Sequence, residues 1–236
     1  MTALLSQTIK TAKTENKYKN WENTLTYLLP NKVLCPFSEN CFGPCLKTSG
    51  RLPMAKKAMI ARTKLLFQAP EVFYSQLKEE LAKKYKSAKR KGKKLAYRNN
   101  GTSDRFNEIK KLLELPEEER VFDVAYDYTK DFLRVLEFQG YKGYFLTFSF
   151  DGKNVLESSY LLKNKIANVS VVFAVKKDMP LPAHYSFNGV SYPVIDGDLD
   201  DLRHFDKPGA VVGLRAKGKA IKNPGDFVQK GGFPNA

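Results

Sequence analysis

With 236 residues and a formal net charge of +15, the chain is strongly basic and long enough for one large folded domain. No apolar run approaches the roughly 18 residues that a membrane span requires, and the N-terminus lacks the apolar core of a signal peptide. These features exclude a membrane protein and lead us to expect a cytoplasmic one. A basic surplus keeps a protein soluble and also attracts phosphate groups, so nucleic acid is a candidate partner.

Three regions are expected along the chain. Residues 1–30 are polar, and we predict that they form an N-terminal arm lying on the domain, with no clear strand before the cysteines. Residues 31–220 should form a single α/β domain. Residues 221–236 are rich in Gly, Pro and Lys, which predicts a basic and loosely ordered tail.

Two helices are predicted over residues 53–70 and 70–92, because apolar side chains recur there every three or four residues. Pro53 suits a first helical turn, and Gly92 stands where the second helix should stop. The second helix ends in the basic run KKYKSAKRKGKK. We interpret this run either as a solvated helix end or as a nucleic-acid contact made by Lys84, Lys89, Arg90 and Lys93.

From residue 94 onward the pattern changes to short β-rich runs, and helical segments separate several of them. Strands that alternate with helices predict a parallel sheet or barrel, and the six runs predict a partial (β/α)6, TIM-barrel-like sheet. One connection lacks a helical period and carries Asn188-Gly189 between apolar residues. This dipeptide predicts a β-hairpin inserted into the alternation.

Polar side chains follow several of these strands, where α/β folds carry their functional groups. Each of them could equally cap the helix that follows its strand. The candidate catalytic residues among them are Ser103, Asp104, Asp127 and Lys130. The full set is Asn99, Asn100, Ser103, Asp104, Asp127, Thr129, Lys130, Ser149, Asp151, Asp196, Asp198 and Asp201.

The cysteines Cys35, Cys41 and Cys45 are the only ones in the chain and fall within CPFSENCFGPC. Disulfides are rare in a reducing compartment, so three grouped thiols indicate metal binding before they indicate a bridge. Three ligands leave one coordination position open. Three interpretations stay open: a 4Fe-4S cluster with one free iron, a zinc site, or free thiols that pack in the core.

Several motifs together carry a resemblance: CPFSENCFGPCLKTSGR, RNNGTSD, VFDVAYDYTK, YFLTFS, VIDGDLDDLR and VVGLRAKGKA, in that order. The chain resembles a family of phage- and plasmid-borne proteins with a three-cysteine loop. It is more distantly similar to radical S-adenosylmethionine proteins, which are iron–sulfur enzymes. A phage origin would put the protein in the host cell cytoplasm.

The distant similarity implies a cluster bound by Cys35, Cys41 and Cys45 at the C-terminal mouth of the strands. It also implies that a polar turn, Gly101, Thr102, Ser103 and Asp104, faces the amine of S-adenosylmethionine. The expected function is then the modification of a nucleic acid, nucleotide or protein. The alternative is a nucleic-acid-binding replication or accessory factor whose metal is structural.

Overall fold

The computed structural model describes residues 2–45, 48–50 and 52–230. The helices are α1 (Ile9–Lys17), α2 (Lys56–Gln68), α3 (Pro70–Arg90), α4 (Asn107–Leu113), α5 (Phe132–Glu137), α6 (Val155–Lys163) and α7 (Lys219–Lys222), with short 3-10 turns η2 (Leu52–Ala55), η3 (Glu117–Glu119) and η4 (Arg203–Phe205). The strands are β1 (Leu5–Ser6), β2 (Trp21–Thr26), β3 (Lys94–Arg98), β4 (Val124–Thr129), β5 (Tyr144–Ser149), β6 (Asn168–Phe173), β7 (His184–Phe187), β8 (Val190–Asp196), β9 (Val211–Arg215) and β10 (Val228–Gln229).

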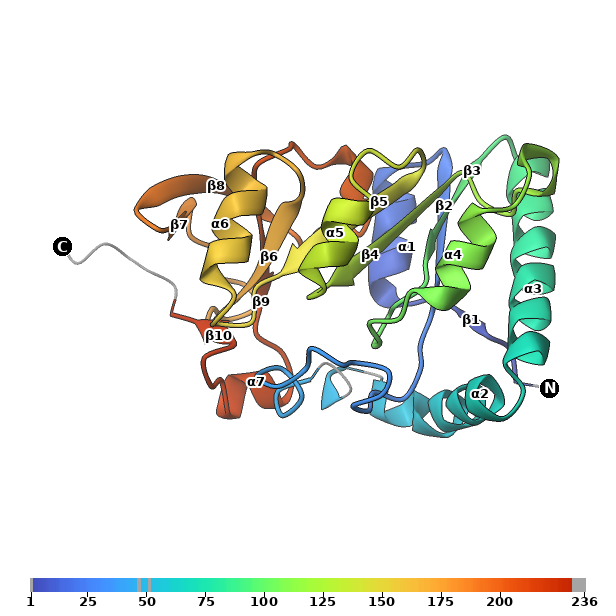
Figure 1. Cartoon of the computed structure of the whole chain (residues 1–236), viewed down its shortest axis with the longest axis horizontal. Coiled ribbons are helices and arrows are strands. Elements are labelled where there is room, and N and C mark those ends of the chain that lie inside the picture. Colours follow the sequence, from blue (N-terminus) through green and yellow to red (C-terminus); the bar gives the residue numbers. More distant parts are fainter. Residues whose placement is uncertain (1, 46–47, 51, 231–236) are drawn as a thin grey trace.

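These strands form one 10-stranded sheet in the order β1-β2-β3-β4-β5-β6-β9-β8-β7, and β10 pairs with β6. Every pair from β2 through β6 to β9 and β8 is parallel, whereas β1 and β7 pair antiparallel at the two edges. Strands therefore lie side by side in nearly the order in which they occur in the chain, as in a barrel, but the sheet stays open (Figure 1). The predicted α/β class and the partial-barrel arrangement are confirmed.

The two faces of the sheet are covered differently. On one face α3 packs its fully buried Leu77 and Leu81 against Leu95 and Tyr97 of β3, and α6 packs against β6 in a second cluster. On the opposite face a small cluster contains Trp21, Ala96, Tyr126 and Leu202. Because side chains alternate along a strand, Ala96 and its neighbours Leu95 and Tyr97 serve different layers.

The expectation of a surface arm over residues 1–30 is wrong for Trp21–Thr26, which form β2 inside the sheet. All six of its residues are buried. Its polar side chains find partners there: the Asn23 Nδ2 donates to the Tyr126 hydroxyl (2.9 Å), and the Thr26 and Tyr97 hydroxyls are 2.9 Å apart. A buried parallel strand is normally recognised in the sequence by a continuous run of apolar residues. Strand β2 has no such run, because its buried polar side chains form hydrogen bonds to other buried groups.

The end of the chain is also better packed than expected. Val228 is buried, β10 runs parallel to β6, and the Ala174 amide donates to the Gln229 carbonyl. Gly152 lies so close to this segment that a Cβ there would be 2.2 Å from the Asp226 carbonyl oxygen. Residues 221–229 are therefore part of the domain; residues 231–236 of the predicted tail lie outside the described residues, which end at 230.

The predicted hairpin is confirmed as β7 and β8, with Phe187 opposite Val190. Asn188 and Gly189 both have positive φ, 47° and 74°, as a type I′ turn requires. The second arm, β8, then joins the main sheet beside β9. No described helix combines the length and the apolar character that crossing a bilayer would require.

Candidate functional site

The cysteine loop comprises residues 27–55, of which the structure describes 27–45, 48–50 and 52–55. Its described part leaves the end of β2 and runs along the edge where the parallel strands end (Figure 1). In Figure 1 it lies below the sheet, between α7 on one side and α2 on the other. Two hydrogen bonds to its carbonyl groups join it to the turn after β3: the Asp104 amide donates to the Leu34 carbonyl (2.8 Å), and the Thr102 hydroxyl donates to the Leu28 carbonyl (2.5 Å). The contacting residues of the cysteine loop and of this turn are about seventy positions apart in the sequence, yet the two segments are neighbours.

Close backbone contact explains the glycine in that turn. The Gly101 amide donates to the Thr26 carbonyl at 2.9 Å. A Cβ at position 101 would lie 2.5 Å from the Tyr27 ring and 2.8 Å from the Leu25 side chain. Only glycine fits this approach of the β3 turn to the end of β2 without displacing one of those side chains.

The three cysteines are half-buried and none forms a disulfide. The Cys35 thiol donates to the Thr102 carbonyl at 3.7 Å. Burial, aided by the negative charges of Cys45, Asp104 and Cys41, raises the pKa of Cys35 to about 12, and Lys130 only partly opposes this rise. All three thiols and Asp104 therefore share one neighbourhood, and Cys35 carries its proton at neutral pH.

The thiols do not converge on a point, however. Among residues 2–45, 48–50 and 52–230, no three His, Cys, Asp or Glu side chains are grouped closely enough to hold a metal ion. A metal centre shared by the three sulfurs therefore remains a prediction.

A buried hydrogen-bond network holds the turn after β3 against β4. Asp127 is fully buried, and its carboxylate accepts from the Asn100 amide (2.7 Å), the Asn100 Nδ2 (3.1 Å) and the Tyr144 hydroxyl (3.1 Å). The Ser103 hydroxyl donates to the Asn100 Oδ1 at 2.8 Å. Burial outweighs these donors and raises the pKa of Asp127 to about 6.

Asp104 forms the second contact between the two turns. One of its carboxylate oxygens accepts from the Lys130 amide at 2.9 Å, and the other pairs with the buried guanidinium of Arg134. The backbone of Lys130, rather than its ammonium group, therefore fixes Asp104 beside Cys35. Of the four candidate catalytic residues, Asp104 and Asp127 make hydrogen bonds that join the turn after β3 to β4 and to the turn that follows it, whereas Ser103 bonds to Asn100 within its own turn.

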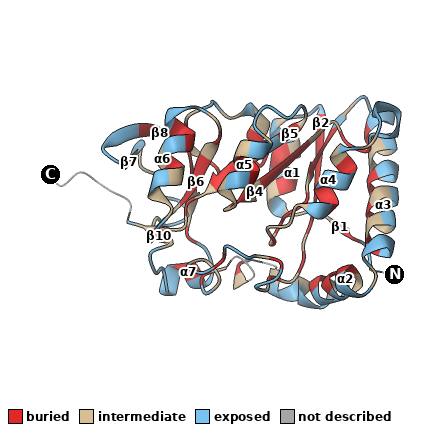
Figure 2. Ribbon diagram, viewed as in Figure 1, coloured by how far each residue is buried: buried red, intermediate tan, exposed pale blue. Residues whose placement is uncertain are grey.

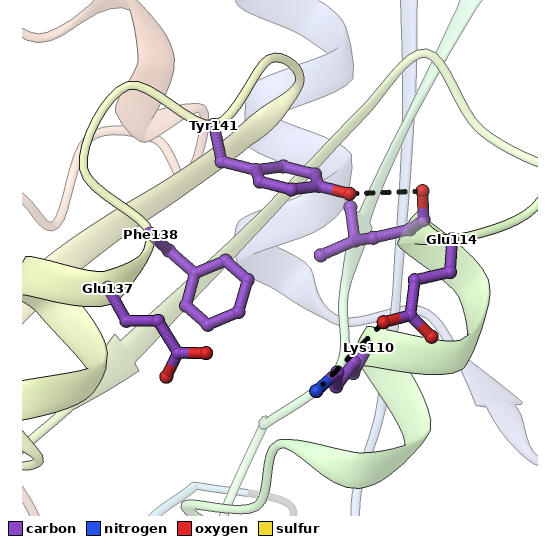
Figure 3. Close-up of a pocket in the computed structure, with 6 residues that line it drawn as sticks. Lys110, Glu114, Glu137, Phe138 and Tyr141 are labelled. Carbon is purple, nitrogen blue, oxygen red and sulfur yellow. Dashed lines mark hydrogen bonds and ion pairs between the residues drawn. The ribbon is translucent and has the colours of Figure 1, made fainter.

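The other strand-end residues do not join this group. The Ser149 hydroxyl lies 3.2 Å from the Ser170 hydroxyl, and Asp196 forms an ion pair with Arg215 at 2.9 Å. One surface hollow, of about 280 Å³, lies between the last turns of α4 and α5 (Figure 3). Asp104 and Lys130 precede the first turns of those helices, so this hollow lies away from the cysteine loop. Its six lining residues are Lys110, Leu113, Glu114, Glu137, Phe138 and Tyr141.

The basic end of α3 lies at the opposite edge, where the strands begin. Lys84 and Lys91 both pair with Glu22 at the start of β2, at 3.3 and 2.9 Å. Lys89 pairs with Asp123, next to β4, at 2.6 Å. Of the four residues predicted to contact phosphate, Lys84 and Lys89 are therefore paired within the chain, whereas Arg90 and Lys93 have no acidic partner among the described residues.

A buried ionic cluster, which sequence reasoning missed, joins α1 to the segment around η4. Lys10 pairs with Asp201 at 2.7 Å, Lys17 pairs with Asp200 at 2.6 Å, and Arg203 pairs with Asp200 at 2.8 Å. The spacing of Lys10 and Lys17, two turns apart on one helix face, is the signal that could have indicated this contact. The acidic run DGDLDD is thus engaged by cations of the chain itself.

Comparison with known proteins gives one match. The model of the family "Gene product 88" matches residues 3–230, nearly the whole chain. No curated protein and no solved structure matches. This agrees with the phage-type family resemblance of the cysteine loop and the strand-end motifs. Since the match covers the sheet, the cysteine loop and the C-terminal segment alike, the chain belongs to the gene product 88 family.

Proposed function

We propose that this protein is an iron–sulfur protein of the radical S-adenosylmethionine type, in which Cys35, Cys41 and Cys45 ligate a 4Fe-4S cluster. The observation that carries the proposal is the position of the cysteine loop. It leaves the first strand of a sequentially ordered parallel sheet and lies against the turn that ends the next strand. This edge is where strand–helix folds hold their functional groups.

The donor set fits such a cluster. Three thiols and no histidine suit iron–sulfur ligation better than structural zinc, which needs a fourth ligand. Burial raises the pKa of Cys35, and the charges of Cys45 and Cys41 add to this rise, which is consistent with both thiols lying near Cys35. Since no three ligating side chains converge among the described residues, the loop must draw the sulfurs together as the cluster binds.

The chain's own residues would position what binds there. When bound, the cluster supplies the electron that splits a carbon–sulfur bond of S-adenosylmethionine. Asp104 is held in place by Arg134 and by the Lys130 amide. Its carboxylate is the group to which we assign the hydrogen bond from the amine of S-adenosylmethionine. The Cys35 proton must leave on metal binding, because the thiolate is the ligand.

Anaerobic reconstitution with iron and sulfide tests the proposal. We expect about four irons per chain, thiolate-to-iron charge-transfer absorption, and consumption of S-adenosylmethionine on reduction. Cys35→Ser, Cys41→Ser and Cys45→Ser should each lose the cluster. Asn40→Ser, which changes the same loop without touching a sulfur, should retain it.

Equal iron content in the three serine variants and the unaltered protein would rule out ligation by these cysteines. A colourless protein that retains one zinc would instead favour the alternative, a nucleic-acid-binding factor with a structural metal. A cluster that forms normally but leaves S-adenosylmethionine unbound would limit the proposal to an iron–sulfur protein of another type.

A further inference from the structure

A group of exposed lysines flanks the cysteine loop. Lys32 lies in the loop, Lys56 and Lys57 begin α2, and Lys219 and Lys222 lie on α7. The two ends of this row are joined to the loop directly, since α2 continues from it and the Lys219 amide donates to the Thr48 hydroxyl at 3.1 Å. Figures 1 and 2 show α7, the loop and α2 in one largely exposed row along the C-terminal edge of the sheet. We call these five lysines, together with Phe37, the edge surface.

The lysines of the edge surface keep their full charge, whereas the basic run at the end of α3 is partly neutralised. Within the described part of the chain, none of the five has an acidic side chain at ion-pair distance. At the end of α3, Lys84, Lys89 and the capping residue Lys91 are paired with Glu22 or Asp123. The remaining cations of that run, among them Lys83, Lys86, Arg90 and Lys93, have no acidic partner among the described residues and therefore provide a matched comparison. Unpaired lysines are free to bind phosphates, whereas paired ones must first lose an internal partner.

Phe37 adds a second kind of contact. It lies within the cysteine loop, two residues after Cys35, and its side chain is 46% exposed. An exposed aromatic ring among lysines is the combination with which proteins hold single-stranded nucleic acid, because the ring stacks on a base while the cations follow the backbone. In a duplex the bases are already stacked and cannot receive the ring.

We propose that the edge surface binds single-stranded nucleic acid, with a base stacked on Phe37 beside the cysteine loop. This inference deepens the proposed function, since it names the substrate class that reaches the candidate cluster site. The binding it describes uses none of the sulfurs, so it can be measured separately.

Fluorescence anisotropy with a labelled single strand of about 20 nucleotides tests the surface. Five phosphate contacts predict that the logarithm of the affinity falls with that of salt with a slope of about −3.5. The variant Lys56→Ala/Lys57→Ala/Lys219→Ala/Lys222→Ala should bind at least about tenfold more weakly at low salt, with a slope below about 1 in magnitude.

The matched control removes the same charge from the other edge: Lys83→Ala/Lys86→Ala/Arg90→Ala/Lys93→Ala. We expect its affinity to stay within about twofold of the unaltered protein, because long-range attraction alone is screened by salt. A control variant that loses as much affinity as the first variant, or more, would overturn the assignment to the edge surface.

Phe37→Leu should weaken binding about tenfold, and Phe37→Tyr, which keeps a ring, should restore it. The same strand annealed to its complement should bind more weakly than the single strand. Equal binding of duplex and single strand, or equally effective displacement by polyglutamate with no effect of Phe37→Leu, would overturn the proposal in favour of a general anion or acidic-protein surface.

The triple variant Cys35→Ser/Cys41→Ser/Cys45→Ser separates the two proposals. Its binding of the single strand should match that of the unaltered protein without a cluster. If iron is never bound but the edge surface binds as described, only the proposed function fails. If iron is bound and the single strand is not, only the present inference fails.

Discussion

The raised pKa of Asp127, which lies in the hydrogen-bond network of the candidate site, predicts that the stability of the protein depends on pH. The Asp127 side chain is fully buried and faces two donors from Asn100 and the hydroxyl of Tyr144. Burial raises the pKa of Asp127 to about 6 from an ordinary value of 3.8. Asp127→Asn keeps the size of the side chain and removes its ionisation.

The magnitude follows from the pKa difference. A shift of roughly two units corresponds to about 3 kcal/mol of pH-dependent stability. Because the pKa of the folded state is the higher one, folding takes up a proton at intermediate pH. The contribution of Asp127 is therefore fully present below about pH 4 and is lost as the pH rises through about 6.

Urea unfolding of the unaltered protein and of Asp127→Asn between pH 4 and pH 8 measures this effect. The free energy of unfolding of the unaltered protein, minus that of the variant, should fall by about 3 kcal/mol across the range. Asp206, whose burial also raises its pKa to about 6, is present in both proteins and cancels in the difference. The variant should also carry a constant cost of about 1–3 kcal/mol, since its new amide group faces other donors.

A difference that does not change with pH would refute the raised pKa of Asp127. A difference that grows with pH would show that the three donors stabilise the carboxylate more than burial destabilises it. In that case Asp127 would be an anchor for the turn through its charge.

Three further predictions concern packing and the cysteine loop. Gly101→Ala should lower the free energy of unfolding by about 1–3 kcal/mol, whereas Gly43→Ala, where an added Cβ meets nothing within 4 Å, should change it little in the same urea titration. Leu77→Ala should cost about 2–5 kcal/mol, whereas Val72→Ala, on the same helix but 51% exposed, should cost far less. Alkylation of Cys35 by iodoacetamide, followed by mass spectrometry, should still accelerate above pH 10; a plateau near pH 9 would contradict its raised pKa.

The sequence predicts the parts of the fold in which apolar side chains repeat. The helix expected over residues 70–92 is α3, from Pro70 to Arg90, and its buried Leu77 and Leu81 belong to the predicted stripe. Strand β2 was missed because Asn23, Thr24 and Thr26 interrupt the apolar pattern. Their burial depends on partners such as Tyr97 and Tyr126, which are distant in sequence and cannot be inferred from local periodicity.

The candidate site was predictable in its location but not in its contacts. The distant similarity to radical S-adenosylmethionine proteins placed the cysteine loop and the turn at residues 101–104 at one edge, and hydrogen bonds do join the two segments. Cavity lining and helix capping were the two roles foreseen for the polar strand-end residues. Asp127 and Asp104 instead join neighbouring loops to one another, while Asp131, which was not among them, caps α5 by accepting from the Arg134 amide at 3.1 Å.

The distribution of positive charge follows from the same alternation. A helix that returns from the end of one parallel strand to the start of the next must carry its own last turn to the edge where strands begin. The densest basic run, at the end of α3, is therefore delivered to Glu22 and Asp123, away from the cysteine loop. Cations beside the cysteine loop must lie in loops, or in the first turn of a helix that begins at the edge where the strands end. Lys56 and Lys57 are in the first turn of α2, which follows the cysteine loop. In this chain, Lys84 and Lys89 find their acidic partners at the edge to which α3 carries its last turns.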